Sequence, residues 1–155
     1  VPFLILMIIV IPLSRLIVGT SIGTVASIVP LVIASFPFVS RLVETSMREV
    51  DAGVIEAAQS MGASPLQIIM KVMIPESMPS LVANITIAAT TIMGYGAMAG
   101  IIGGGGLGKV AINYGYYRFN VVLEFVATAL LVVLVQVLQT FGTKLAVRCD
   151  KRIQK

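Results

Sequence analysis

The sequence predicts an all-α protein whose helices form a polytopic transmembrane bundle. Of its 155 residues, 57% are hydrophobic and only 12% are charged, whereas soluble domains carry about 25% charged residues. Its mean hydropathy is +1.01. Lipid-facing surface is apolar, so a bilayer accounts for this composition where water does not. The apolar runs lack the alternation of barrel strands, so the spans are predicted to be helices.

The spans follow from three long stretches without charge, which are residues 16–40, 77–108 and 125–143. Each is long enough to cross a hydrocarbon core of about 30 Å as a helix. We place the spans near residues 20–43, 79–102 and 121–143. The run 1–14 is shorter than a span, and we expect it to be the end of a helix in a chain truncated at its N-terminus. We treat residues 1–155 as one transmembrane domain.

The distribution of Lys and Arg predicts the topology. Of the 11 basic residues, most lie between residues 41 and 76 or after the last span, and few lie in the other connections. Basic residues accumulate on the cytoplasmic side. We therefore expect a multi-pass protein of the cell inner (plasma) membrane, with loop 46–76 and the C-terminus in the cytoplasm. The basic residues form no aromatic-rich patch for nucleic acid.

Residues for covalent chemistry are scarce. The chain has no histidine and one cysteine, Cys149. A lone cysteine is not a metal site, and the commonest general base is missing. The spans contain no pair of ionisable groups of the kind an intramembrane enzyme needs, and only Glu124 lies near a span. The sequence therefore predicts no catalytic residue, no cofactor site and no metal site.

Loop 46–76 contains signals for two short helices. Asp51 is a candidate N-cap for a helix over 52–61, and Gly62 suits the left-handed position that ends a helix.

Beyond Gly62, Ser64 can cap a second helix. Pro65 suits its first position, and Gln67 would close a capping box. Pro75 is expected to end this helix.

Apolar residues recur at helical spacing on both short helices: Val54, Ile55, Ala58 and Met61, then Leu66, Ile69 and Met73. Such faces can dock into a groove of a partner protein. They can equally pack back on the chain's own bundle, and the residues alone leave both alternatives open.

A family resemblance favours docking. Glu56-Ala57-Ala58, then Gly62, then Val72-Met73-Ile74-Pro75 resembles the E-A-A…G…I-x-L-P loop of permease subunits of bacterial ABC importers. The sequence departs from that pattern conservatively at Val72 and Ile74. The resemblance implies coupling helices that dock into a cytoplasmic ATPase subunit. The coupling residues it implies are Glu56, Ala57, Ala58, Gly62, Ser64, Pro65 and Pro75.

Three further segments resemble the methionine permeases of that family: residues 16–23, Gly103–Gly108 with Tyr114-Gly115-Tyr116, and Arg118-Phe119-Asn120. The resemblance implies a homodimer of permeases, two copies of the ATPase subunit and an extracytoplasmic methionine-binding lipoprotein. It implies contact with the bilayer and none with nucleic acid.

Small and polar residues inside the spans are candidates for the pathway or for helix interfaces: Asn84, Thr86, Thr90, Thr91, Gly96 and Gly100. Polar residues in a bilayer run favour protein or a pathway over lipid. The pairs Gly19/Gly23 and Gly96/Gly100 have the spacing that permits close helix packing. Pro30 and Pro37 are expected to kink their span.

The run Gly103–Gly108 lacks the G-K-[ST] ending of a phosphate-binding loop, since Lys109 precedes Val110. We expect a tight turn or a short re-entrant segment outside the membrane.

The sequence thus indicates the permease of an ATP-driven methionine uptake system, which moves solute by alternating access and leaves ATP hydrolysis to its partner. The alternatives are a permease for an osmoprotectant or another amino acid, a non-transporting membrane scaffold, and an intramembrane enzyme.

The topology can be tested with reporters. A reporter fused after Lys155 is expected in the cytoplasm and one inserted near Asn113 outside, because the basic residues are concentrated on one side. Accessibility labelling of intact cells measures this. Finding both reporters on one side would contradict the three-span topology.

Overall fold

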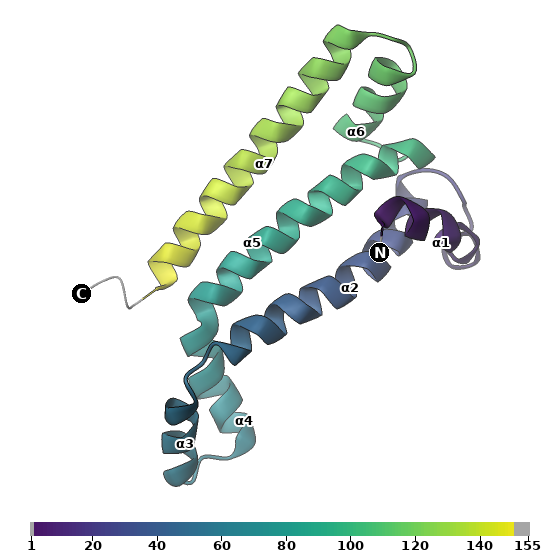
Figure 1. Ribbon diagram of the computed structural model, residues 1–155. Coiled ribbons are helices and arrows are strands. Elements are labelled where there is room, and N and C mark those ends of the chain that lie inside the picture. Colours follow the sequence, from purple (N-terminus) through teal and green to yellow (C-terminus); the bar gives the residue numbers. More distant parts are fainter. Residues whose placement is uncertain (1, 151–155) are drawn as a thin grey trace. The chain divides into compact units, whose positions relative to one another are not determined.

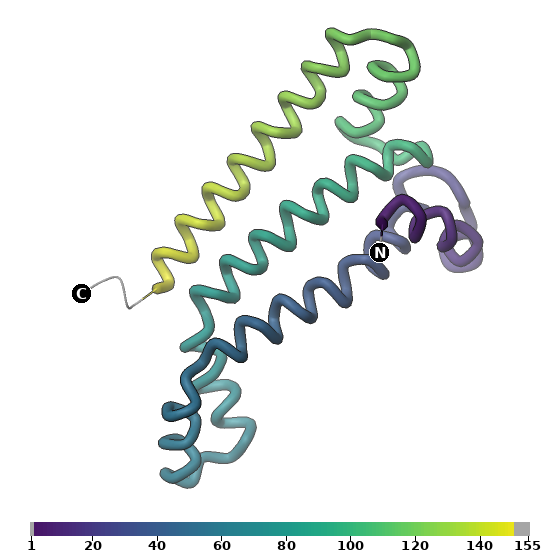
Figure 2. Tube along the Cα trace, viewed as in Figure 1, coloured from purple at the N-terminus to yellow at the C-terminus, as the bar shows by residue number. Residues whose placement is uncertain are grey.

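The computed structural model describes residues 2–150 as helices joined by short connections (Figure 1). The described residues fall into two compact units. The first joins the chain up to Phe38 to Ala89–Leu138, and the second joins Val39–Ala88 to the residues after Leu138. Three helical segments of the described chain are long and apolar enough to cross a membrane: Thr24–Arg48, Pro65–Ile102 and Val121–Cys149. Figure 2 follows the chain through them.

The connection between the first two helices differs from what the sequence predicted for Gly19 and Gly23. Helix α1 spans Phe3–Val18, continues past Arg15 and ends at Gly19, whose φ is 78°. Gly23 has a φ of 107°. Glycine adopts these angles without the strain that a Cβ brings. The prediction that Gly19 and Gly23 form a helix-packing pair is wrong, because they shape a turn between helices.

Helix α2 spans Thr24–Arg48 and contains both Pro30 and Pro37. It therefore begins later and ends later than the span expected at 20–43. Each proline removes one backbone donor, yet the helix continues through both. The kinks expected at these residues stay a prediction. Hydroxyl groups of this helix donate to carbonyl oxygens one turn back, as in the 2.6 Å bond from Ser35 to Leu31.

The expectation that Pro75 ends a helix is wrong. Helix α4 spans Pro65–Ile68, the π-helix η1 follows at Ile69–Met73, and α5 spans Ile74–Met98. The amide of Ile74 donates to the carbonyl of Ile69, five residues back. A π-turn is wider than an α-turn, so it offers room for the ring of Pro75 where an α-turn would clash. The helix therefore continues, and the candidate span reaches from Pro65 to Ile102.

The glycine-rich run is a tight turn, as one of the two expectations had it. The 3₁₀-helix η2 covers Ala99–Ile102, and Gly103 and Gly106 then take φ angles of 79° and 88°. Two short elements follow, α6 at Leu107–Lys109 and the π-helix η3 at Val110–Tyr116.

This turn is held against the start of α2 within the first unit. The amide of Gly23 donates to the carbonyl of Ile102 at 3.1 Å. The amide of Gly105 donates to Oγ1 of Thr24 at 2.9 Å. In the same unit, the rings of Phe3 and Tyr95 stack with centroids 4.7 Å apart. The two hydrogen bonds satisfy backbone N–H groups of Gly23 and Gly105 that the turn would otherwise leave without acceptors.

Two glycines allow backbone segments to touch. A Cβ on Gly100 would lie 2.7 Å from the carbonyl carbon of Gly108, and a Cβ on Gly108 would overlap the backbone of Ala97. Gly96, by contrast, has open space around it. Of the predicted packing pair Gly96/Gly100, only Gly100 therefore makes a close approach among the described residues.

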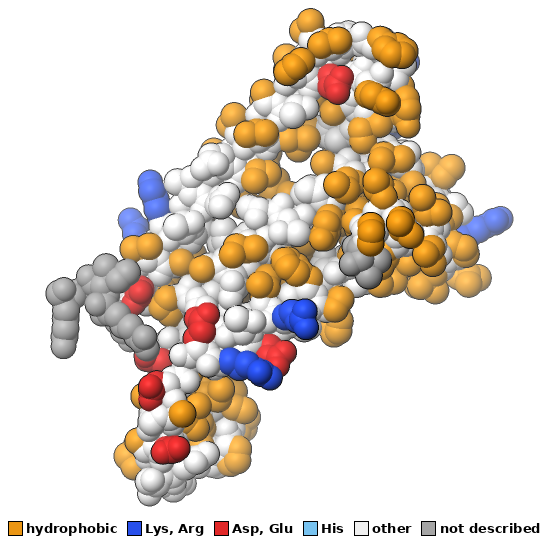
Figure 3. Space-filling model, in the orientation of Figure 1, with side chains coloured by type: hydrophobic (Ala, Val, Ile, Leu, Met, Phe, Trp, Pro, Cys, Tyr) orange, Lys and Arg blue, Asp and Glu red, His pale blue; other side chains and the backbone are white. Residues whose placement is uncertain are grey.

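Helix α7 spans Val121–Cys149 and completes the described chain. The side chain of Asn120 accepts from the amide of Leu123 at 3.2 Å, near the start of the helix. Only 6% of the apolar window of α7 is buried, and hydrophobic side chains cover much of the face drawn in Figure 3. This is the surface expected of a helix that meets lipid or further helices.

Replacing Gly108 with alanine is expected to destabilise the first unit by about 1–3 kcal/mol, because the added methyl group overlaps Ala97. Gly96→Ala is the matched control, since its methyl group meets no atom and alanine favours helices. Thermal unfolding in detergent measures both. Equal unfolding temperatures for the two variants would contradict the close packing.

Candidate functional site

The two short helices form a hairpin in the second unit, which we call the α3–α4 hairpin (residues 51–73). Helix α3 spans Ala52–Ser60, and Oδ1 of Asp51 accepts from the amide of Gly53 at 2.7 Å. The predicted N-cap is confirmed. The helix ends one residue before the predicted bound, because Met61 is the C-cap.

The turn after α3 is a Schellman motif centred on Gly62. The amide of Ala63 donates to the carbonyl of Ala58 at 3.1 Å, and the amide of Gly62 donates to Gln59 at 2.9 Å. Gly62 has a φ of 79°. The motif needs a left-handed residue here, which glycine supplies without strain. The predicted helix end at Gly62 is confirmed.

The second helix starts with the predicted capping box. Oε1 of Gln67 accepts from the amide of Ser64 at 2.9 Å, and Oγ of Ser64 accepts from the amide of Gln67 at 3.4 Å. Pro65 occupies the first helical position, where its missing donor costs nothing. The hairpin direction is therefore fixed by local hydrogen bonds on both sides of its turn.

The hairpin buries little and exposes apolar side chains. Ala58 and Ile68 are buried inside it. Met61 and Leu66 are 81% and 70% exposed. The exposed apolar side chains, which we call the hairpin patch, are Val54, Met61, Leu66, Ile69 and Met70. Glu56 and Ala57 are exposed beside them, and Figure 3 shows hydrophobic atoms gathered over this element. The described chain does not cover the patch.

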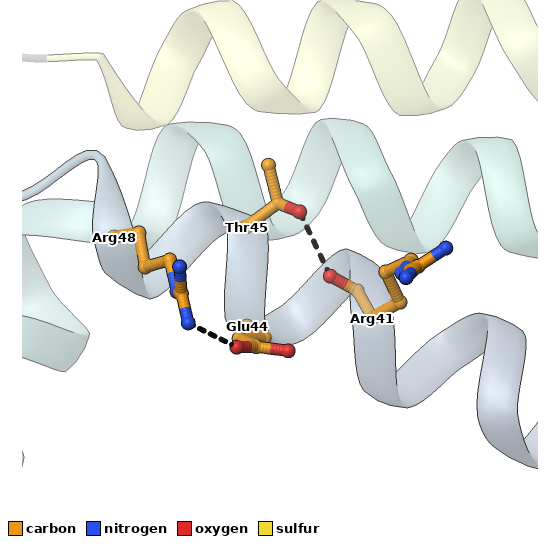
Figure 4. Close-up of polar contacts among 4 residues, drawn as sticks. All are labelled: Arg41, Glu44, Thr45 and Arg48. Carbon is orange, nitrogen blue, oxygen red and sulfur yellow. Dashed lines mark hydrogen bonds and ion pairs between the residues drawn. The ribbon is translucent and has the colours of Figure 1, made fainter.

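The end of α2 has a charged face and a polar face. On the charged face, Nη2 of Arg48 lies 2.7 Å from Oε1 of Glu44, and Oγ1 of Thr45 donates to the carbonyl of Arg41 (Figure 4). Both charged side chains of the ion pair are more than half exposed. Such exposed pairs contribute little to stability.

The polar face of α2 meets α5 within the second unit. Nδ2 of Asn84 donates to Oγ of Ser46 at 2.8 Å and to the carbonyl of Leu42 at 3.3 Å. Oγ of Ser80 lies 3.3 Å from Oγ of Ser46. Ser77 is buried against Sδ of Met47, 3.6 Å from its hydroxyl oxygen. The structure thus places Asn84 at a helix interface.

The sequence reasoning missed the three serines of this interface. The available signal was the spacing of Ser77, Ser80 and Asn84, which puts three polar groups on one face of a helix. The partner on α2, Ser46, carries no such signal.

The other candidate pathway residues are divided between the two units. Thr86 lies in the second unit, where a Cβ on Gly142 of α7 would overlap its side chain. Thr90 and Thr91 are half-buried in the first unit. Thr86 therefore lies at a contact between α5 and α7. Within the described residues, the six candidates do not come together in one site.

A cavity of about 420 Å³ opens in the second unit between the ends of α2, α5 and α7. The residues that line it include the acidic Glu49, Glu76 and Asp150 and the polar Ser77 and Ser80. Among residues 2–150 no group of His, Cys, Asp and Glu has the arrangement to hold a metal ion.

The structure defines a helical polytopic membrane protein with a short-helix hairpin between two spans. Residues 1–155 match the family described as the inner membrane component of binding-protein-dependent transport systems. The chain belongs to this family, whose match covers its whole length.

Relatives extend the comparison. The chain is 53% identical over 152 residues to the "Probable D-methionine transport system permease protein MetI" of Vibrio cholerae, covering 98% of this chain and 68% of that protein. It is 48% identical over 152 residues to the "Methionine import system permease protein MetP" of Bacillus subtilis, with the same two coverages.

A solved structure agrees in fold. It shows the inward-facing MetNI methionine ABC transporter in a native crystal form. The identity to the matching chain is 44% and the TM-score is 0.93, over 97% of this chain and 70% of that one. The expected fold class, a helical bundle of the ABC importer permease type, is confirmed.

The capping box yields a local prediction. Ser64→Ala is expected to destabilise the start of α4 by about 0.5–2 kcal/mol, because the amide of Gln67 loses its acceptor. Ser64→Asp keeps an acceptor and serves as the control. Hydrogen exchange of the amides at 66–70 measures the effect. Equal protection in the alanine and aspartate variants would contradict the role of the cap.

Proposed function

We propose that this chain is the membrane-spanning permease of an ATP-driven methionine importer. The proposal is supported by relatives at 53% and 48% identity that are named for methionine transport. It is supported further by a methionine ABC transporter of known structure at a TM-score of 0.93. The chain lines the pathway, and it is an inner membrane component by family.

The observation that carries the coupling role is the α3–α4 hairpin. It contains the signature residues Glu56, Ala57, Ala58 and Gly62, a Schellman turn and a capping box, so its shape is locally fixed. Its hairpin patch is exposed in the described chain. A rigid helical element with exposed apolar residues suits the helix-in-groove mode of recognition. In our proposal it docks into a groove of a separate ATPase subunit.

The proposed assembly has two permease copies and two ATPase subunits. ATP hydrolysis takes place in the ATPase subunits, and the permease performs no covalent step. Closure of the ATPase pair moves the two hairpins, and the spans rock between outward-open and inward-open states. An extracytoplasmic lipoprotein delivers methionine. The hairpin and the C-terminus then face the cytoplasm, in agreement with the distribution of basic residues.

The substrate is tested with the complete complex in sealed vesicles. We expect ATP-dependent uptake of labelled methionine that unlabelled methionine suppresses and an osmoprotectant such as betaine does not. Suppression by betaine with no effect of methionine would overturn the substrate assignment. Absence of any ATP-dependent uptake would favour a membrane scaffold.

Gly62→Val is expected to uncouple ATP hydrolysis from uptake. A β-branched residue at a φ of 79° is strained by about 1–3 kcal/mol, so the turn relaxes and the hairpin meets the ATPase at a changed angle. Uptake per ATP hydrolysed and co-purification of the ATPase subunit measure the effect. Membrane insertion is expected to stay normal because no span changes.

Gly62→Asn is the matched control, since asparagine tolerates the left-handed region better than other side chains. We expect it to retain most of the coupling. If Gly62→Val kept normal uptake, normal ATPase activity and normal co-purification, the α3–α4 hairpin would not be the coupling element.

A further inference from the structure

A polar cluster, partly buried, joins α2 to α5 directly beside the hairpin. It consists of Ser46 on α2 and of Ser77, Ser80 and Asn84 on α5, and we call it the stem clasp. All four residues lie in the second unit. Ser46 is 0% exposed and Ser77 is 3% exposed, although both are polar. The hairpin leaves the stems after Arg48 and returns at Ile74, so the clasp closes the base of the hairpin.

The hydroxyl of Ser46 is the centre of the clasp, and its hydrogen-bonding capacity is fully used. It donates to the carbonyl of Leu42 at 3.1 Å. It accepts from Nδ2 of Asn84 at 2.8 Å and from the hydroxyl of Ser80 at 3.3 Å. A hydroxyl offers one donor and two acceptor sites. No partner is spare, so loss of either α5 residue leaves this oxygen short of a bond.

The clasp defines one register between the two stems. Met47 near the end of α2 contacts Ser77 near the start of α5, and Leu42, which lies earlier on α2, contacts Asn84, which lies later on α5, as antiparallel helices require. An apolar interface tolerates sliding because its contacts are interchangeable. A slide of one turn here would separate the buried hydroxyl of Ser46 from the half-buried side chains of Ser80 and Asn84, which is costly away from water. The two stems are therefore held against sliding.

We propose that Asn84, acting through Ser46, is a positioning residue of the coupling step. It binds the α2 and α5 stems so that a movement of the α3–α4 hairpin shifts both stems together. Without it, part of that movement is lost as sliding between the stems. This inference rests on the proposed coupling role of the hairpin.

The test is Asn84→Leu in the complete importer. Uptake per ATP hydrolysed is expected to fall about threefold, the population change that one average interhelical hydrogen bond in a membrane protein represents. Basal ATP hydrolysis is expected to continue, since the hairpin itself is unchanged. Ser46→Ala is expected to lower coupling at least as far, because it removes the bond from Asn84 and also the bond from Ser80.

Thr45→Val is the matched control. Thr45 is the neighbour of Ser46, but it is exposed and its hydroxyl bonds to Arg41 of its own helix (Figure 4). We expect normal coupling in this variant. A loss equal to that of Ser46→Ala would mean that any hydroxyl removed from this turn has the effect, and would overturn the proposal.

A distance measurement separates positioning from folding. Spin labels at Arg48→Cys and Met78→Cys, in a Cys149→Ser background, report on the two stems within one unit. Asn84→Leu is expected to broaden the distance distribution between the labels. An unchanged distribution with unchanged uptake per ATP would overturn the proposal. If Asn84→Leu fails to assemble, the same two measurements on Ser46→Ala decide the matter by the same criteria.

The outcomes also separate this inference from the proposed function. If Gly62→Val uncouples the importer and neither clasp variant does, only the clasp proposal fails. If none of these variants alters coupling, the coupling role of the hairpin fails as well.

Discussion

The bilayer leaves the backbone of this chain no water to bond with, so each polar main-chain group inside it needs a partner in the protein. Helices satisfy this demand within one segment, and three helical segments of the described chain are long and apolar enough to cross: Thr24–Arg48, Pro65–Ile102 and Val121–Cys149. The turns between the helices are hydrogen-bonded as well. The amides of Gly23 and Gly62 donate to the carbonyls of Ile102 and Gln59, and the amide of Gly105 donates to Oγ1 of Thr24. The conformations of these turns are therefore fixed by specific hydrogen bonds, as those of the helices are.

The proline positions show how a helix can meet this demand despite a missing donor. Pro65 occupies the first helical position, where a backbone N–H would have no acceptor within the helix, so the missing donor costs nothing. Pro75 follows a π-turn, in which the amide of Ile74 reaches back five residues. The wider turn carries the chain from the hairpin into α5 without a break. The second arm of the hairpin and the span that follows it are consequently one continuous helix, which suits a part proposed to pass motion from a partner to the membrane.

Much of the candidate site could be predicted from local signals. The cap at Asp51, the turn at Gly62 and the box of Ser64 with Gln67 depend on residues a few positions apart, so their spacing in the sequence contains the necessary information. The failures have the opposite cause. Gly19 and Gly23 have the spacing of a packing motif, yet their φ angles of 78° and 107° belong to a turn. Whether a glycine allows close helix packing or adopts a left-handed turn conformation depends on where the helix ends.

The sequence by itself determined the helical membrane class, the number of long spans and the local form of the hairpin, because composition and short-range capping set these properties. Only the tertiary structure decided which polar residues meet. Ser46 lies 38 positions from Asn84 along the chain, and its hydroxyl accepts the amide at 2.8 Å. No local pattern marks that pairing, since it depends on the register of two helices. The same holds for Gly142 against Thr86 and for Gly108 against Ala97.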